Sequence, residues 1–188
     1  MKKQLSYVSL VIGLLLALST FSVSANDGDK LRAKLVGRQE VPAVSTVATG
    51  EFEARIESDN TISFKLSYEG LEGAVAPVAP TQAHIHVGQR NVNGGVTVFL
   101  CGGPRPACPP SPATVEGKIT AADIIALPTQ ELPAGAFDEL VRALRSGLTY
   151  ANVHTPGSPG GEIRGQIRAD NGRHRGHDDD DDHGHHDH

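Results

Sequence analysis

Alternating polar and apolar residues are the feature of this chain that most restricts its fold. In segments 51–57 and 62–68 every second residue is apolar, and Ser58, Asp59 and Asn60 between them are residues typical of turns. Because strand side chains point alternately to two faces, each segment predicts a strand with one buried and one solvated face. Six further strands are predicted at 31–36, 83–87, 96–100, 113–119, 149–154 and 162–167. Eight short strands separated by turn residues predict an all-β sandwich or barrel.

Two segments predict short helices beside these strands. Thr120 with Asp123 three residues later resembles a helix N-cap and predicts a helix over 121–127, which Pro128 would end. In the second segment, 136–146, four apolar residues recur at helical spacing, and a glycine follows where a C-terminal cap belongs. We expect these four residues to face the core: Phe137, Leu140, Val141 and Leu144.

Glycine and proline mark two hairpin connections. Asn93, Gly94 and Gly95 form a turn signal before the strand at 96–100, and segment 155–161 is expected to bring the chain back from 149–154 to 162–167. Glu40 precedes a Val-Pro pair and is expected at the surface, where it could cap or bridge a strand edge.

The N-terminal residues predict export from the cytoplasm. Lys2 and Lys3 precede an apolar run over 8–18, and Ala25 ends a Val-Ser-Ala sequence that suits signal peptidase. The alternative is a membrane anchor. It is disfavoured because a spanning helix needs about 20 apolar residues, and the apolar run over 8–18 is much shorter. Residues 1–25 are therefore predicted to be a cleaved signal peptide, and the mature protein is expected in the periplasm or outside the cell, with no membrane span.

Charge and size narrow the remaining chain. The full sequence has 17 basic and 22 acidic residues, so loss of Lys2 and Lys3 leaves 15 basic residues and a formal charge of 15 − 22 = −7. This balance argues against a nucleic-acid partner. Residues 26–170 have the length of one domain. Its two cysteines, Cys101 and Cys108, predict a disulfide in an oxidising compartment; a reactive thiol pair is the alternative.

Residues 171–188 differ sharply in composition, because they are rich in Arg, His, Asp and Gly. With little apolar surface to bury, they are predicted to be disordered. They are either a solvated tail or a flexible chelator of Zn, Cu or Ni, since imidazoles and carboxylates bind these ions. The chelating residues would be His174, His177, His183, His185, His186 and His188.

The other three histidines lie in two predicted strands. His84 and His86 alternate with apolar residues and would share one face, and His154 would add a third imidazole if its strand lies nearby. Three neutral imidazoles with a water in the fourth position would suit Zn(II), and Cu is also compatible with them. The alternative is a structural cluster of hydrogen-bonded histidines.

Four segments resemble the CHRD domain: 35–42, 83–88, 150–155 and 159–166. The resemblance covers about residues 31–169, and the Asn-Val-His-Thr and Gly-Glu-Ile-Arg-Gly sequences are its most specific parts. The family is named from chordin, an extracellular antagonist of bone morphogenetic proteins, and includes many exported bacterial proteins. It implies an exported domain and no established biochemical activity.

CHRD domains are in turn distantly similar to Cu/Zn superoxide dismutase. This resemblance implies an immunoglobulin-like Greek-key β-sandwich of about eight strands with one or two short helices. His84, His86 and His154 match copper ligands of the dismutase, and Arg164 falls where that enzyme has its anion-guiding arginine. No histidine occurs between Val87 and Val153, so the bridging and zinc-binding histidines of the dismutase are missing. Residues expected to support the three histidines are Asn152, Glu162, Arg164 and Gln166.

Three functional hypotheses follow. The first is a non-enzymatic module that binds an extracellular protein or carbohydrate, with the histidines stabilising it or binding metal. The second is metal handling through the tail and the three-histidine site. The third, a copper- or zinc-dependent metalloenzyme, is weakened by the missing ligands, and no nucleophile with a base at recognisable spacing is found.

Overall fold

The computed structural model describes residues 29–73 and 78–170. The predicted signal peptide and the predicted tail lie outside the described residues. Within the described part of the chain, no helix is long and apolar enough to cross a membrane.

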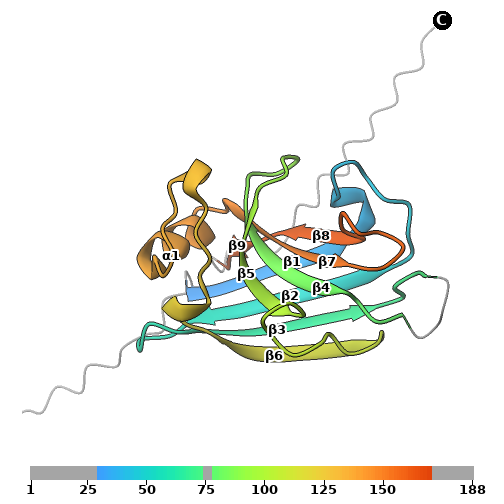
Figure 1. Ribbon diagram of the computed structural model, residues 1–188, viewed down its shortest axis with the longest axis horizontal. Helices are drawn as coiled ribbons and strands as arrows, with labels where there is room; N and C mark the ends of the chain where they lie inside the picture. The colour runs from blue at the N-terminus through green and yellow to red at the C-terminus, as the bar shows by residue number, and fades with distance from the viewer. Residues whose placement is uncertain (1–28, 74–77, 171–188) are drawn as a thin grey trace, which may run out of the picture.

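Nine strands form the described fold (Figure 1). All strand pairs are antiparallel, and the strands follow the order β5-β4-β7-β8-β1-β2-β3-β6, with β9 paired to β1. The strands are β1 (Lys30–Val36), β2 (Thr49–Ile56), β3 (Ile62–Glu69), β4 (Gln82–Val87), β5 (Gly95–Cys101), β6 (Ala113–Ile119), β7 (Thr149–His154), β8 (Ile163–Gln166) and β9 (Arg168–Ala169). The expected strands are present, and the last one is divided into β8 and β9 around the buried Ile167.

The sheet consists of two halves around one core. One half contains β5, β4, β7 and β8, and the other contains β1, β2, β3 and β6; the pair Val36 and Arg164 joins them. Strands β5 and β6, at the two ends of the order, also contact each other, so the sheet is nearly closed. Both halves contribute fully buried side chains to the core, such as Phe52 and Leu66 from one and Ile85 and Val153 from the other. The all-β, sandwich-like class is confirmed.

The half-sheet of β1, β2, β3 and β6 has a ladder of charged residues on its outer face. Along one row across β1, β2, β3 and β6, positive and negative residues alternate, in the order Arg32, Glu53, Lys65 and Glu116. Opposite charges on neighbouring strands attract weakly and keep this face soluble. The alternation in the sequence therefore correctly separates the core face from the solvated face.

Helix α1 (Phe137–Arg145) agrees with the prediction for 136–146, and three of its four apolar residues are buried: Leu140, Val141 and Leu144. The predicted helix over 121–127 is wrong. Thr120 and Asp123 do form the expected capping box, with the Thr120 amide donating to the Asp123 carboxylate at 2.8 Å, but the turn that follows, η3 (Ala121–Asp123), is a single 3-10 turn.

The chain leaves that turn because it pairs with the edge of β5. The amide of Ile125 donates to the carbonyl of Thr97 at 2.8 Å, and Leu127 forms an isolated bridge with Leu132 around a second 3-10 turn, η4 (Pro128–Gln130). The bond from Ile125 satisfies a backbone carbonyl of the edge strand β5, which a helix over this segment would leave without that partner. Tertiary hydrogen bonds thus decide the conformation of this segment.

The disulfide between Cys101 and Cys108 is confirmed, with the two Cα atoms 5.0 Å apart. It closes a short loop after β5 that reaches the opposite end of the sheet order. Arg105 in this loop donates to the carbonyl of Lys118 on β6 at 2.9 Å and pairs with Asp123. The loop therefore covers part of the free edge of β6.

Replacing Leu140 by alanine should lower the free energy of unfolding by about 2–5 kcal/mol, because its side chain is fully buried between α1 and the sheet. Leu148 is the matched control: it is 47% exposed, and Leu148→Ala should change stability by less than about 0.5 kcal/mol. Urea denaturation of both variants measures the difference. Equal effects would show that α1 does not carry core packing.

Candidate metal centre

The pairing of β4 with β7 brings the three histidines together. His84 lies opposite Asn152, His86 opposite Tyr150, and Gln82 opposite His154. The residues that alternate with the two histidines on β4, Ala83 and Ile85, point into the core. The histidines therefore project from the other face of this half-sheet, as the alternation predicts.

Loops cover this outer face, so the histidines are buried although they point away from the core. His84 is 2% exposed, and His86 and His154 are each 7% exposed. One potential ligand nitrogen from each ring lies within 4.8 Å of the others. The structure thus places the three predicted residues in one buried cluster.

Hydrogen bonds determine which nitrogen of each ring carries the proton. Nδ1 of His86 contacts the carbonyl oxygen of Gly94 at 3.0 Å, and Nδ1 of His154 contacts that of Pro159 at 2.9 Å. A carbonyl only accepts, so both Nδ1 atoms are protonated and both Nε2 atoms of the neutral rings carry lone pairs. Nδ1 of His84 lies 3.2 Å from Nε2 of His154 and must donate to it. All three rings are then Nδ1-protonated.

Two of the resulting lone pairs have no hydrogen-bond partner. Nε2 of His84 and Nε2 of His86 are buried, and neither contacts a donor among the described residues. Leaving such a group unpaired costs free energy, and buried polar atoms in native proteins are nearly always satisfied. Bare nitrogens of neutral imidazoles are atoms that a transition-metal ion binds.

The rings are neutral at physiological pH. Burial lowers the pKa of His84 to about 3, with a further contribution from His154 and His86. Burial also lowers the pKa of His86 to about 4, against the opposing effect of its Gly94 hydrogen bond, and it lowers the pKa of His154. Neutral imidazole is the form that binds metal, so the cluster needs no deprotonation at neutral pH.

Arg164 and Tyr150 extend the cluster on one side. The guanidinium of Arg164 lies 3.4 Å from the ring centroid of Tyr150, whose ring stacks on His86 with centroids 4.6 Å apart. Arg164 is 2% exposed and donates to Asn93 Oδ1 and to the carbonyls of Gln89 and Val92. Its hydrogen bonds thus hold the loop between β4 and β5.

Glu40 is buried, and its expected surface position is wrong. It accepts a hydrogen bond from Asn152 at 2.5 Å, and burial raises its pKa to about 7 against the attraction of Arg164. The chain after β1 folds over the outer face of β7 and β8 and brings this carboxyl inside. The Val-Pro pair that follows it gave no signal of this burial.

Glu162 and Gln166 lie near the histidines in sequence, but their hydrogen bonds go elsewhere. The carboxylate of Glu162 accepts from the hydroxyls of Thr46 and Thr155 and from the amide of Glu72. The amide of Gln166 donates to the carbonyls of Gly88 and Gly147 (2.9 and 2.8 Å). Both residues hold connecting loops together, whereas backbone carbonyls orient the rings of His86 and His154.

Tyr150 is the neighbour that sequence reasoning missed. It alternates with Asn152 and His154 in β7, and this spacing would have placed it on the same face as the histidines. The signal was present, because the polar Asn152 and His154 alternate with the apolar Ala151 and Val153.

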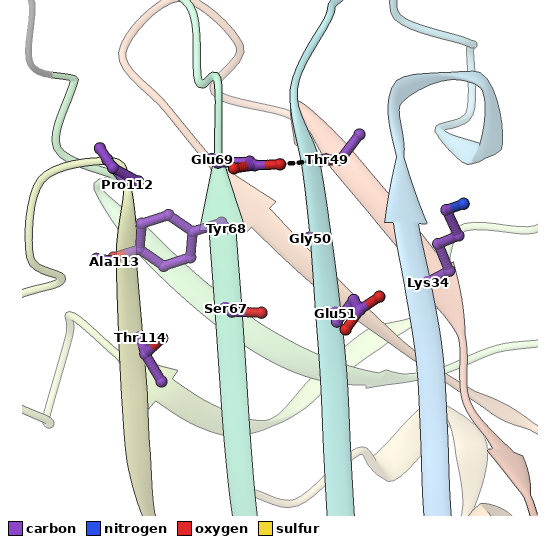
Figure 2. Close-up of a pocket in the computed structure, with 10 residues that line it drawn as sticks. All are labelled: Lys34, Thr49, Gly50, Glu51, Ser67, Tyr68, Glu69, Pro112, Ala113 and Thr114. Atoms are coloured by element: carbon purple, nitrogen blue, oxygen red, sulfur yellow. Dashed lines mark hydrogen bonds between the residues drawn. The ribbon is translucent and has the colours of Figure 1, made fainter.

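A separate surface hollow of about 680 Å³ lies on the outer face of the other half-sheet (Figure 2). Figure 2 shows Thr49 of β2 hydrogen-bonded to Glu69 of β3, beside the exposed Lys34 and Glu51 on β1 and β2. None of the residues that line this hollow is a histidine: Lys34, Thr49, Gly50, Glu51, Ser67, Tyr68, Glu69, Pro112, Ala113 and Thr114. The hollow and the histidine cluster are different surfaces.

Acid should destabilise the metal-free protein through the histidines. An unfolded histidine has a pKa near 6.5, whereas the folded values are lower. Below pH 6.5 the unfolded chain therefore binds more protons, and the free energy of unfolding should fall by up to about 1.4 kcal/mol per pH unit for each of His84 and His86, down to about pH 4. His154 should contribute in the same direction. Urea denaturation between pH 8 and 4, with a chelator present, measures this slope.

A variant with His84→Ala, His86→Ala and His154→Ala, called the triple-alanine variant, should show a flatter slope. An unchanged slope would contradict the assignment of the acid effect to these three histidines.

Gly161 should tolerate no side chain. Its φ is +124°, and an added Cβ would lie 2.6 Å from Asn152 Nδ2 and from Glu40 Oε1. Gly161→Ala should therefore lower the free energy of unfolding by about 2 kcal/mol or more. Gly160→Ala is the matched control, since nothing lies within 4 Å of its added Cβ. Similar melting temperatures for the two variants would show that the loop does not pack on this pair.

Comparison with known proteins identifies the family of this chain. Searches of the curated proteins and of the solved structures gave no match. The family model described as CHRD domain matches residues 31–167, which is most of the chain and includes all three clustered histidines. A disulfide and this domain are compatible with an exported protein. The chain belongs to the CHRD domain family.

Proposed function

We propose that this chain is an exported, non-enzymatic binding module whose CHRD domain holds one transition-metal ion, Zn(II) or copper, at His84, His86 and His154. The observation that carries the proposal is the buried cluster of three neutral imidazoles, in which Nε2 of His86 has no partner and Nδ1 of His84 lies 3.2 Å from Nε2 of His154. An ion bound by these three nitrogens would give Nε2 of His86 a partner.

The spacing of the nitrogens supports a shared ion. Nδ1 of His84 and Nε2 of His154 are 3.2 Å apart. Two ligands about 2.0–2.1 Å from a tetrahedral ion are about 3.3 Å apart, so an ion could lie between these two atoms if the ring proton of His84 moves from Nδ1 to Nε2. His86 would contribute Nε2, because its Nδ1 donates to Gly94. Ligand nitrogens that lie up to 4.8 Å apart would move up to about 1.5 Å closer together on binding.

Hydrogen bonds from the histidine rings to backbone carbonyls have the form found in metal sites. Histidine ligands usually donate their other N–H to a carbonyl or carboxylate, which fixes the ring and its tautomer. His86 and His154 do so through Gly94 and Pro159. His84 differs, because its Nδ1 contacts His154 instead of a carbonyl. Its ring packs edge-to-face against Phe99, with the two ring centroids 4.5 Å apart.

A metal-free structural cluster is the competing explanation. The direct contact between His84 and His154 and the two bonds to carbonyls would link β4, β7 and the neighbouring loops without any ion. This explanation leaves the buried Nε2 of His86 without a partner, at a cost of about 1–3 kcal/mol, whereas an ion would bind it. Metal content therefore separates the two explanations.

The six histidines of the tail are a second candidate for metal binding, so the measurement of metal content needs a variant that lacks them. The tail variant replaces these six by alanine: His174, His177, His183, His185, His186 and His188. A protein or carbohydrate partner remains a further proposal, for which the hollow in Figure 2 is a candidate surface.

Elemental analysis after loading with Zn(II) or copper tests the proposal. The mature chain and the tail variant, purified without a metal column and passed through gel filtration, should each retain at least about one equivalent, because three converging imidazoles form a tight site. Adding the three substitutions of the triple-alanine variant to the tail variant should remove it.

Circular dichroism tests whether the combined variant, which carries both the tail and the triple-alanine substitutions, keeps its fold. Equal metal content in the tail variant and the combined variant would leave only the structural role for the three histidines.

A further inference from the structure

We infer that Tyr150 is a positioning residue of this site: its ring and its hydroxyl together hold His86 in the tautomer that presents a bare Nε2 to the ion. The inference deepens the proposed function and rests on it for its consequence for metal affinity. The tautomer itself is a property of the metal-free protein.

The first contact is ring stacking. The rings of Tyr150 and His86 are nearly parallel, with an interplanar angle of 7° and centroids 4.6 Å apart. The two residues are directly opposite each other in the β4–β7 register, so the strand pairing itself sets this contact. Stacking restricts the ring of His86 to one plane. Within that plane the ring can still adopt two orientations, which differ by a half turn about its bond to Cβ.

The second contact selects between these two orientations. The amide of Gly94 donates to the Tyr150 hydroxyl at 3.1 Å, and the carbonyl of the same residue accepts from Nδ1 of His86 at 3.0 Å. Tyr150 therefore fixes the residue that supplies the acceptor for Nδ1. With Nδ1 protonated, the lone pair is on Nε2, which is buried and unpaired.

Arg164 completes the arrangement from the other side. Its guanidinium packs on the Tyr150 ring at 3.4 Å and donates to Gln89, Val92 and Asn93, which precede Gly94 in the loop. One buried cation thus orders both the tyrosine ring and the chain that leads to the acceptor carbonyl. This arrangement also explains why Arg164 is buried: its donors hold the loop.

The tautomer can be read directly from the ring nitrogens. Long-range ¹⁵N–¹H NMR of the metal-free protein at pH 7 distinguishes a protonated from a bare imidazole nitrogen, and His86→Gln assigns the resonance. In the native chain His86 should be a single Nδ1-protonated tautomer. Tyr150→Phe keeps the ring and loses the hydroxyl, so the His86 signal should become a mixture of both tautomers. Tyr150→Leu, which also loses stacking, should show a larger share of the second form.

Tyr68→Phe is the matched control. Tyr68 is also buried, and its hydroxyl donates to a backbone carbonyl, that of Pro109, at 2.5 Å, but it lies on β3 in the other half-sheet. This variant should lose stability without any change at His86. If Tyr150→Phe loses stability as Tyr68→Phe does and His86 stays a single Nδ1-protonated form, Tyr150 is merely structural and the inference is overturned.

Metal affinity provides the second measurement. In the tail-variant background, Tyr150→Phe should weaken Zn(II) binding about 10-fold or more, as is usual when the partner that orients a ligand is lost. Tyr68→Phe should leave it unchanged. Unchanged affinity in Tyr150→Phe would overturn the inference while keeping the metal site. Absence of ion binding in every chain would overturn the proposed function, and the NMR tautomer would still decide whether Tyr150 positions His86.

Discussion

The antiparallel pairing of β4 with β7 is the interaction on which the rest of the site depends. It places His84 and His86 beside Tyr150 and Asn152 and brings His154 to the same face. The alternate residues of the two strands, including Ile85 and Val153, enter the core. A shift of this register by one residue would exchange the two faces and place the histidines in an apolar core. The pairing that builds the core therefore also builds the cluster.

The two halves of the sheet treat their outer faces in opposite ways. The half with β1, β2, β3 and β6 exposes its charged ladder to water, where each charge is hydrated. The half with β4 and β7 is covered by loops, so every polar group beneath them needs a partner within the protein. Arg164, Glu40 and Asn152 find such partners. Nε2 of His84 and Nε2 of His86 do not, and the proposed ion would give Nε2 of His86 a partner.

How far sequence reasoning succeeded differs between elements. Strands β2 and β3 have one wet face, so their alternation predicted both the strands and the direction of the side chains. Helix α1 was predicted because a single apolar stripe faces the core. The segment 121–127 carried a true capping box, yet hydrogen bonds to the β5 edge prevented a helix. Such competition depends on which strand lies nearby, and local propensity contains no information about it.

The sequence by itself determined the all-β class, the disulfide and the shared face of His84 and His86, because these follow from alternation and from short separations along the chain. Only the tertiary structure decided that His154 joins them, that Glu40 is buried, and that Tyr150 and Gly94 hold His86. Those contacts join residues between 8 and 112 positions apart, and chain folding, rather than any local pattern, brings such residues into contact. Burial then lowers the pKa of the histidines and leaves two nitrogens without partners, which no property of the residues alone could reveal.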